Sequence, residues 1–289
     1  MPVMLDNLPG LQWIDNGQSV LSGAPLELTR RLDRAFVRLA EHWSAAEYQF
    51  PTFIPAAALD ELDYFRSFPH LATFPVALDP DERNLERFTN GQVLDREGGL
   101  QLTTTSPIRD VLTPAACYHF YVNLRDHDLD APRYLTTRNT CFRREAFYRP
   151  LARQWSFSMR EIVCIGTADE VKAFLARTQA MVGALLEVLG LPVEWAQATD
   201  PFFKPATNPG YLMQKVDPVK LEAVFGDALA ISSVNLHQDH FGDTYRIRRD
   251  GRVAFSGCVA FGLERWLLAI VTTHGPDERN WPRLPAVGA

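Results

Sequence analysis

Arginine, glutamate and aromatic side chains alternate in the stretch NTCFRREAFYRPLARQWSFSMREIVCIG, residues 139–166. The guanidinium of Arg143 suits a phosphate group, because its planar fork donates two parallel hydrogen bonds. An aromatic ring such as that of Phe157 suits a nucleobase, which can stack on it. Arg149 and Arg153 lie in the intervening loop and can close over outer phosphates. These residue types point to a surface that binds phosphates and a base.

Two strands joined by a loop must position these side chains. Side chains alternate along a strand, so Arg143 and Glu145 share one face of the first strand. The same rule gives one face of the second strand a longer set, namely Trp155, Phe157, Met159, Glu161 and Val163. If the two faces coincide, the sheet presents an arginine, an aromatic ring and two carboxylates. The alternative is a hairpin with a solvated, salt-bridged face, which the interleaved Phe142 and Met159 make less favourable.

A second candidate cation, Arg265, comes from the segment AFGLERW. The chain leaves a strand through Gly262 and enters a helix, so Arg265 lies in the first helical turn. From this motif alone, an exposed pair of Glu264 with Arg265 is an equally good interpretation.

Cysteine and histidine are the remaining candidates for chemistry. Four scattered cysteines occur, none of them in a CxxC pair: Cys117, Cys141, Cys164 and Cys258. In a cytosolic chain we expect reduced thiols or metal ligands rather than disulfides. A buried, inert thiol is the commonest role of a free cysteine. His119, His237 and His240 are possible ligands or bases, but hydrogen-bonded or exposed histidines without such a role are more common.

The rest of the chain predicts helices grouped around a block of strands. Thr167 and Glu170 form a capping box for a long helix that ends at Gly190, and Thr113 with Pro114 is typical of another helix start. Further helices are predicted at LELTRRLDRAFVRLAEHW, ALDELDYF and GLERWLLAIVTTHG, further strands at EYQFPTFIP, GLQLTTT, LAISSVNL, TYRIRR and RVAFSGCVAF, and irregular chain at residues 75–98. Strands do not alternate regularly with helices, which favours an α+β fold with a mostly antiparallel sheet flanked by helices.

Length and composition set the broad class of the protein. The 289 residues are 46% hydrophobic, which suits one large domain. The net charge of -6 excludes a strongly basic nucleic-acid-binding protein. The first residues, MPVMLDNLPG, lack the pattern of a signal peptide, and no apolar run is long enough to span a membrane. We therefore expect a cytoplasmic protein that does not enter the membrane.

Several of these segments together resemble the class II aminoacyl-tRNA synthetases. CFRRE with FSMREIV is similar to their motif 2 (about 139–166), and GLERW to their motif 3 (about 253–275). GAPLELTRRLDRAFVRLAEHW with YQFPTFIP resembles the dimer-forming motif 1 (about 23–55). LTPAACYHFY and LAISSVNLHQDHFG resemble two active-site segments of seryl-tRNA synthetases. The resemblance implies one class II catalytic domain over residues 1–289 and a homodimer.

Two departures narrow the resemblance. Only about 20 residues precede motif 1, so we expect no helical arm of the kind that grips tRNA. Cys117 stands where seryl enzymes carry a glutamate. Cys117, Glu161 and Cys258 fall where methanogen-type seryl enzymes keep a zinc site. This combination resembles the amino acid:[carrier protein] ligases, truncated seryl-synthetase homologues of bacteria. Members of that family load an activated amino acid on the phosphopantetheine thiol of a carrier protein, not on tRNA.

The resemblance also implies site roles. Two thiolates and one carboxylate leave the fourth position of a tetrahedral zinc ion open for the neutral amine of the substrate. Arg143 would hold the α-phosphate of ATP, Glu145 the adenine amino group, and Phe157 one face of the ring, while Arg265 would cover its other face or hold the γ-phosphate. Further implied ATP-binding residues are Arg153, Ser233 and Asn235. Magnesium should accompany ATP, but Ala230 stands where related seryl enzymes have a magnesium-binding acid.

The expected reaction is adenylation of a small amino acid, glycine or alanine, followed by transfer to a carrier protein. One alternative is a fragment of a tRNA-charging enzyme, which the missing arm and the acidic charge disfavour. A second alternative is a non-catalytic sensor of an amino acid or adenylate, which the retained site residues disfavour. Basic residues that a carrier protein can contact, if they are not simply a solvated helix face, are Arg30, Arg31, Arg34, Arg38 and Lys172.

Overall fold

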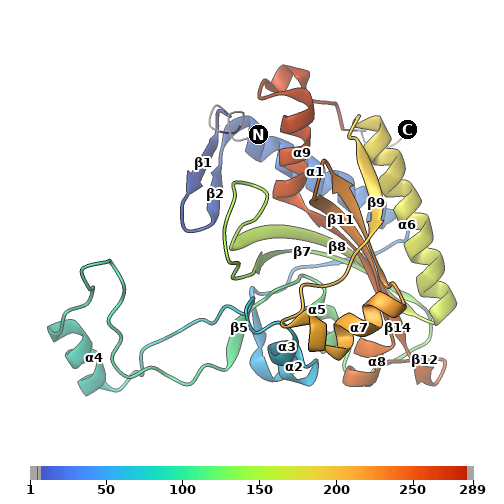
Figure 1. The fold of residues 1–289 in the computed structure, drawn as a ribbon. Helices are drawn as coiled ribbons and strands as arrows, with labels where there is room; N and C mark the ends of the chain where they lie inside the picture. The colour runs from blue at the N-terminus through green and yellow to red at the C-terminus, as the bar shows by residue number, and fades with distance from the viewer. Residues whose placement is uncertain (1–4, 6–7, 285–289) are drawn as a thin grey trace.

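A seven-stranded sheet organises the molecule (Figure 1). The computed structural model describes Leu5 and residues 8–284, so most of the segment in which we expected no signal peptide lies outside the described residues. Neighbouring strands of the sheet are antiparallel, apart from the first pair, which is parallel. Their order is β3 (Ala46–Tyr48), β7 (Arg133–Phe142), β8 (Ser156–Gly166), β14 (Phe255–Gly262), β11 (Leu229–Gln238), β10 (Lys220–Phe225) and β9 (Val193–Gln197). The predicted α+β fold with a mostly antiparallel sheet is confirmed.

Helices cover the sheet on both faces. The first face packs against three long helices: α1 (Gly23–Glu41), α6 (Ala168–Val188) and α9 (Leu263–His274). Short helices lie on the other side: α2 (Ala56–Glu61), α3 (Tyr64–Ser67), α5 (Tyr118–Asn123), α7 (Pro209–Val216) and α8 (His240–Tyr245). Strand β8 is buried on both faces, since Ile162 and Cys164 join one hydrophobic cluster while Val163 and Ile165 join the other. Alternate side chains of β8 therefore pack into two different hydrophobic clusters, one on each face of the sheet.

Helix α6 begins where the sequence predicts. The Thr167 side chain accepts a hydrogen bond from the Glu170 backbone, and the Glu170 carboxylate accepts one from the Thr167 N–H at 2.7 Å. The helix predicted from Thr113 exists as α5, but its start was predicted wrongly. It begins at Tyr118, because the Thr113 hydroxyl donates to the carbonyl of Ala115 and the chain bends before the helix.

Several other predicted segments form two elements instead of one, or a different element. The segment EYQFPTFIP forms two strands, β3 and β4 (Phe53–Pro55), and ALDELDYF forms two helices rather than one. GLQLTTT is not a strand but part of an arm that extends away from the body (Figure 1). The arm also carries the helix α4 (Glu82–Asn90), so the prediction of irregular chain at residues 75–98 is wrong there. Only two residues of TYRIRR are extended. The remaining small strands are β1 (Leu11–Ile14), β2 (Gln18–Leu21), β5 (Asp110–Leu112), β6 (Asp128–Leu129), β12 (Arg248–Arg249) and β13 (Arg252–Val253). Within the described residues, the structure has no helix with the length and apolarity of a membrane span.

A buried arginine ties the first face of the sheet to α1. Arg160 is 3% exposed, and its guanidinium donates to Asp33 of α1 at 2.8 Å and to Glu47 of β3 at 2.7 Å. We expect Arg160→Ala to lower the free energy of unfolding by about 3 kcal/mol, because it leaves the Asp33 carboxylate without its main partner. Urea denaturation at a fixed protein concentration measures this.

The matched control replaces the second, exposed partner of the same carboxylate. Arg138→Ala removes a contact of 3.6 Å to Asp33 and should change stability by no more than about 1 kcal/mol. Equal losses in the two variants would contradict the account given for Arg160.

Candidate functional site

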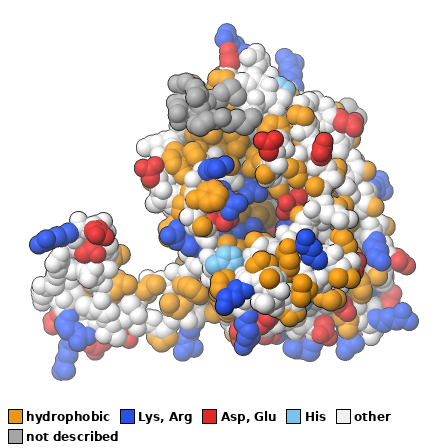
Figure 2. Space-filling model, viewed as in Figure 1, with side chains coloured by type: hydrophobic (Ala, Val, Ile, Leu, Met, Phe, Trp, Pro, Cys, Tyr) orange, Lys and Arg blue, Asp and Glu red, His pale blue; other side chains and the backbone are white. Residues whose placement is uncertain are grey.

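A cavity of about 740 Å³ opens between the second face of the sheet and the short helices. This volume lies in the range of small-molecule sites. Figure 2 shows the hollow near the middle of one face, with basic and acidic side chains around it. Residues of β8, β10, β11 and β14 line its floor, and residues of α7 and the segment before it line one wall.

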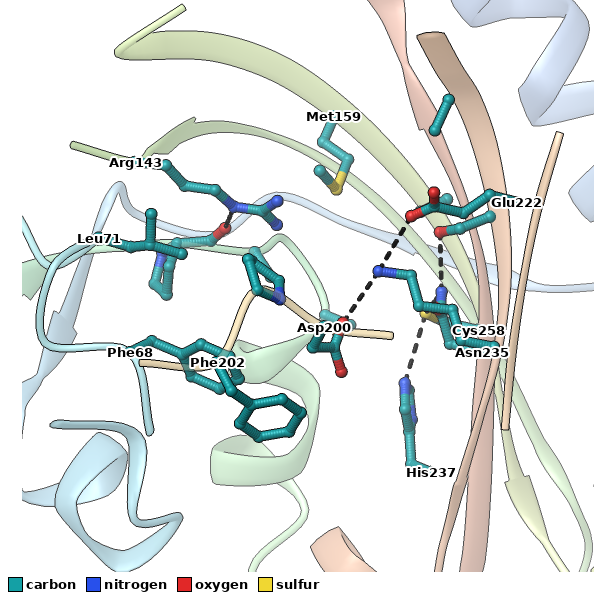
Figure 3. A pocket seen from close by; sticks show the side chains of 18 of the residues that line it. Phe68, Leu71, Arg143, Met159, Asp200, Phe202, Glu222, Asn235, His237 and Cys258 are labelled. Atoms are coloured by element: carbon teal, nitrogen blue, oxygen red, sulfur yellow. Dashed lines mark hydrogen bonds and ion pairs between the residues drawn. The ribbon is translucent and has the colours of Figure 1, made fainter. Parts of the chain in front are cut away.

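Arg143 lies at one side of this cavity (Figure 3). Its Nε donates to the carbonyl of Pro114 at 2.9 Å, and its guanidinium carbon lies 5.4 Å from the centroid of the Phe157 ring. Strand β7 ends at Phe142, so Arg143 and Glu145 lie just beyond the strand. Both side chains nevertheless line the cavity, as the predicted shared face requires. Alternation holds along β8, where Phe157, Met159 and Glu161 all line the cavity.

Arg265 and Arg153 bring two further positive charges to the same place. Arg265 donates from Nε to the carbonyl of Ala152 at 2.8 Å and from Nη1 to the carbonyl of Ala230 at 2.9 Å. Burial, together with the nearby charges of Arg143 and Arg153, lowers the pKa of Arg265. Three arginines that repel one another in a cavity favour a multiply charged anionic ligand.

Two carboxylates near these arginines have different partners, one an arginine and the other a backbone N–H. Glu145 accepts a hydrogen bond from Arg153 at 2.7 Å, which holds the two ends of the loop between β7 and β8 together. Glu264 is buried and accepts the backbone N–H of Ser158 at 2.9 Å. The interpretation of Glu264 and Arg265 as an exposed pair is therefore wrong.

Two thiols and a carboxylate meet on the floor of the cavity. Cys117, Glu161 and Cys258, here named the thiol–carboxylate cluster, are buried, and their ligand atoms all lie within 4.8 Å of one another. Glu161 also accepts the backbone N–H of Ala116 at 2.9 Å. The hydrogen bond with Cys258, burial and the nearby Glu161 raise the pKa of Cys117 well above its ordinary value. Acidic groups gathered this closely favour a bound cation, and two sulfurs with one oxygen fit zinc.

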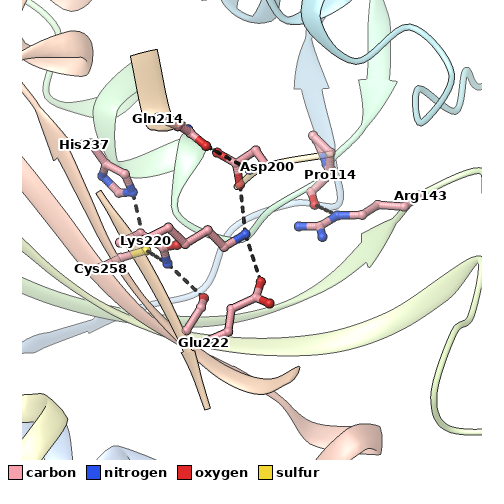
Figure 4. Close-up of polar contacts among 10 residues, drawn as sticks. Pro114, Arg143, Asp200, Gln214, Lys220, Glu222, His237 and Cys258 are labelled. Atoms are coloured by element: carbon pink, nitrogen blue, oxygen red, sulfur yellow. Dashed lines mark hydrogen bonds and ion pairs between the residues drawn. The ribbon is translucent and has the colours of Figure 1, made fainter. Parts of the chain in front are cut away.

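Strand β11 supplies polar side chains next to this cluster (Figures 3 and 4). The Asn235 amide donates to Cys258 Sγ at 3.4 Å and to Ser233 Oγ at 2.9 Å. His237 Nε2 lies 3.6 Å from Cys258 Sγ. The amide of Asn235 thus contacts a thiol of the cluster. ATP binding by Ser233 and Asn235 stays a prediction.

The remaining candidate cysteines and histidines do not belong to the thiol–carboxylate cluster. Cys141 and Cys164 are buried in the protein interior, outside the thiol–carboxylate cluster. His119 stacks on Phe50 with ring centroids 5.1 Å apart. Burial lowers the pKa of His119 to about 4 and that of His237 to about 3, so both imidazoles are neutral near pH 7. His240 is exposed at the rim of the cavity.

A charged network in the cavity was missed by the sequence analysis (Figure 4). Lys220 contacts Asp200 at 2.9 Å and Glu222 at 3.2 Å. Gln214 of α7 donates to Asp200 at 2.8 Å, so the network connects α7 to the sheet. The alternation of Lys220 and Glu222 in KLEAVF is the signal that could have predicted a strand with one polar face.

Comparison with known proteins places this chain in a family. The family model for the tRNA synthetase class II core domain (G, H, P, S and T) matches residues 108–274. Amino acid–[acyl-carrier-protein] ligase 1 of Bradyrhizobium diazoefficiens is 36% identical over 244 residues, which are 81% of this chain and 73% of that protein. Ligase 2 of the same organism is 35% identical over 246 residues, 81% of this chain and 71% of that protein.

More distant relatives share the fold. The type-2 serine–tRNA ligase of Methanopyrus kandleri is 26% identical over 259 residues, 81% of this chain but only 49% of that ligase. A crystal structure of M. kandleri SerRS with A. aeolicus tRNASec matches at a TM-score of 0.81 and 22% identity, covering 96% of this chain and 57% of that one. The chain belongs to the amino acid–[acyl-carrier-protein] ligases, a family of ligases built on the class II tRNA synthetase core.

Proposed function

We propose that this ligase activates glycine or alanine with ATP and then transfers the aminoacyl group to the phosphopantetheine thiol of a carrier protein. The observation that carries the proposal is the layout of one cavity. Arg143, Arg153 and Arg265, here named the arginine cluster, suit phosphates, and the thiol–carboxylate cluster suits an amine-binding metal. Both clusters line the cavity. A substrate held by its amine at the second cluster can present its carboxylate to a phosphate held at the first.

ATP binds along the arginine cluster. Arg143 holds the α-phosphate, and Phe157, beside it, offers its ring to the adenine. Glu145 accepts from the adenine amino group once the loop that now brings Arg153 to it adjusts. Arg265 covers the other face of the ring or holds the γ-phosphate. Magnesium accompanies the phosphates. Ala230 of β11 cannot bind it, but Glu222 on the neighbouring strand β10 also lines the cavity, paired with Ser233, and offers a carboxylate.

The thiol–carboxylate cluster and its neighbours position the amino acid. Cys117, Glu161 and Cys258 would hold zinc, and the ion would supply a Lewis acid for the neutral α-amine. The cluster is packed among buried aromatic residues, including Phe120, Tyr121 and Phe241. The choice of glycine or alanine as the substrate rests on the resemblance to the carrier-protein ligases.

Two displacements complete the reaction. A carboxylate oxygen of the amino acid attacks the α-phosphorus, the bond from that phosphorus to the bridging oxygen breaks, and pyrophosphate leaves. Arg143 stabilises the negative charge that develops on the phosphate. The carrier thiol, which gives up its proton, then attacks the acyl carbon of the adenylate, and AMP leaves. A homodimer formed through α1 and β3 is part of the proposal, because the resemblance to motif 1 covers these elements.

Amino-acid-dependent ATP–pyrophosphate exchange with each of the twenty amino acids, and zinc content of the same preparation, test the first half. We expect exchange with glycine or alanine and about one zinc per chain. Acylation of a phosphopantetheinylated carrier, with the apo carrier as control, tests the second half. Exchange with serine together with tRNA charging would support a tRNA-charging enzyme instead, and no exchange by zinc-loaded protein would support a sensor.

A further inference from the structure

His237 occupies an irregular position in β11, directly beside the thiol–carboxylate cluster. Along the pairing of β11 with β14, Asn235 faces Cys258, Leu236 faces Gly257, and Gln238 faces Ser256. His237 is therefore the extra residue of a β-bulge, and Gln238 after it has a φ of 53°. Bulges redirect side chains and gather next to active sites. At this bulge, the imidazole of His237 lies beside a thiol of the cluster, with Nε2 3.6 Å from Cys258 Sγ.

Aromatic rings from two helices fix the orientation of that imidazole. Tyr121 of α5 is fully buried and stacks on Phe241 of α8, with centroids 3.8 Å apart and planes at 5°. The His237 ring meets Phe241 edge-on at 5.0 Å and Tyr121 edge-on at 6.0 Å. Packing of this kind limits the rotation of all three rings.

The hydrogen-bond partners of His237 differ at its two nitrogens. Nδ1 lies 3.0 Å from the Tyr121 hydroxyl and 3.3 Å from the Ser256 hydroxyl, whereas Nε2 lies 3.6 Å from Cys258 Sγ. A hydroxyl can donate or accept, but a thiolate that binds a metal only accepts. Nε2 must then carry the proton, and Nδ1 must accept from a hydroxyl. The shorter distance assigns that donor to Tyr121.

We propose that His237 is a positioning residue for the metal centre, held by Tyr121 as the tautomer that donates from Nε2 to the Cys258 thiolate. The inference deepens the proposed function and rests on it, since the thiolate exists as such when the metal is bound. With Asn235 also donating to Cys258 at 3.4 Å, two N–H groups converge on one sulfur. They fix the direction of its lone pairs and reduce the charge that it gives to the metal, which leaves the metal a better acceptor for an amine.

A pair of His237 variants tests the donor itself. His237→Leu fills the space without an N–H, whereas His237→Gln can place an amide N–H near the position of Nε2. We expect His237→Leu to weaken zinc binding by about 10–100-fold, the usual effect of losing an outer-shell partner, and His237→Gln to restore most of it. Competition with a chromogenic chelator on the purified full chain measures both affinities.

A spectroscopic readout separates a donor from a merely structural residue. In the cobalt-substituted protein, loss of an N–H donor makes the thiolate more electron-rich. The sulfur-to-cobalt charge-transfer band should therefore move to lower energy in His237→Leu and in Tyr121→Phe, but return toward the wild-type energy in His237→Gln. His119→Gln is the matched control, because His119 is a buried histidine outside the cluster, and its spectrum should not change.

Zinc affinity of His237→Leu within about threefold of wild type, well short of the outer-shell range, would overturn the inference alone. A wild-type chain that takes up no zinc would overturn both the metal site and the inference. Pyrophosphate exchange on the wild-type preparation tests the proposed function separately, since a zinc-binding chain without exchange keeps this inference and loses that function. If His237→Leu does not fold, Tyr121→Phe and its cobalt spectrum decide the matter.

Discussion

Arg143→Ala is expected to lower the rate of amino-acid-dependent pyrophosphate exchange by about 10³-fold, in the range for loss of one charge-stabilising donor. The guanidinium is anchored by its Nε on the Pro114 carbonyl, so its remaining N–H groups are held ready for a phosphate. A group positioned before the reaction stabilises developing charge without reorganising. The measurement is steady-state exchange at saturating ATP and amino acid, with zinc content checked on the same sample.

Two variants make the prediction specific. Arg144→Ala removes the neighbouring arginine, which is exposed and lies over the Tyr148 and Trp155 rings, and it should keep exchange near the wild-type rate. Arg143→Lys keeps the charge but not the planar fork, so it should recover only part of the lost rate. Equal effects of the alanine variants at 143 and 144 would show that Arg143 has no special role.

Cys258→Ala is expected to abolish stoichiometric zinc binding, and exchange with it. The variant removes one of the three proposed ligands, whose candidate ligand atoms lie within 4.8 Å of one another. The loss of affinity should exceed the roughly 10–100-fold effect of an outer-shell partner, because a ligand bond itself is gone. Metal analysis after dialysis against a weak chelator gives the stoichiometry.

Cys164→Ala is the matched control for this variant. Cys164 is equally buried in β8, but it packs into the other hydrophobic cluster, on the α1 and α6 side of the sheet. We expect it to keep one zinc per chain and wild-type exchange, at a modest cost in stability for the lost sulfur. Retention of zinc by Cys258→Ala would refute the assignment of this thiol as a ligand.

Local rules predicted part of the fold and of the cavity. Period-two alternation correctly placed Phe157, Met159 and Glu161 in the cavity, because β8 is long and regular. The capping box at Thr167 marked the start of α6 to the residue. By contrast, Thr113 looked like a helix cap although α5 begins at Tyr118. A cap motif describes only local hydrogen bonds, while the path of this segment is set by Glu161 holding Ala116.

Contacts between distant segments were beyond the reach of sequence patterns. Spacing alone gave no reason to group Cys117, Glu161 and Cys258, and their grouping came from the family resemblance. The same limit explains the missed network of Asp200, Lys220 and Gln214, since its members belong to three separate segments. The β-bulge at His237 depends on the register between β11 and β14, which no single strand encodes.

The thiol–carboxylate cluster links metal uptake to the order of folding. Cys117 precedes α5, whereas Glu161 and Cys258 lie on β8 and β14, which are neighbours in the sheet but far apart in the chain. Pairings of this kind form late, because much chain entropy must be lost before they are made. A metal bound here stabilises the finished topology and gives no help to its early intermediates. As the proposed zinc site, the cluster can take up stoichiometric metal only in chains that have completed these pairings.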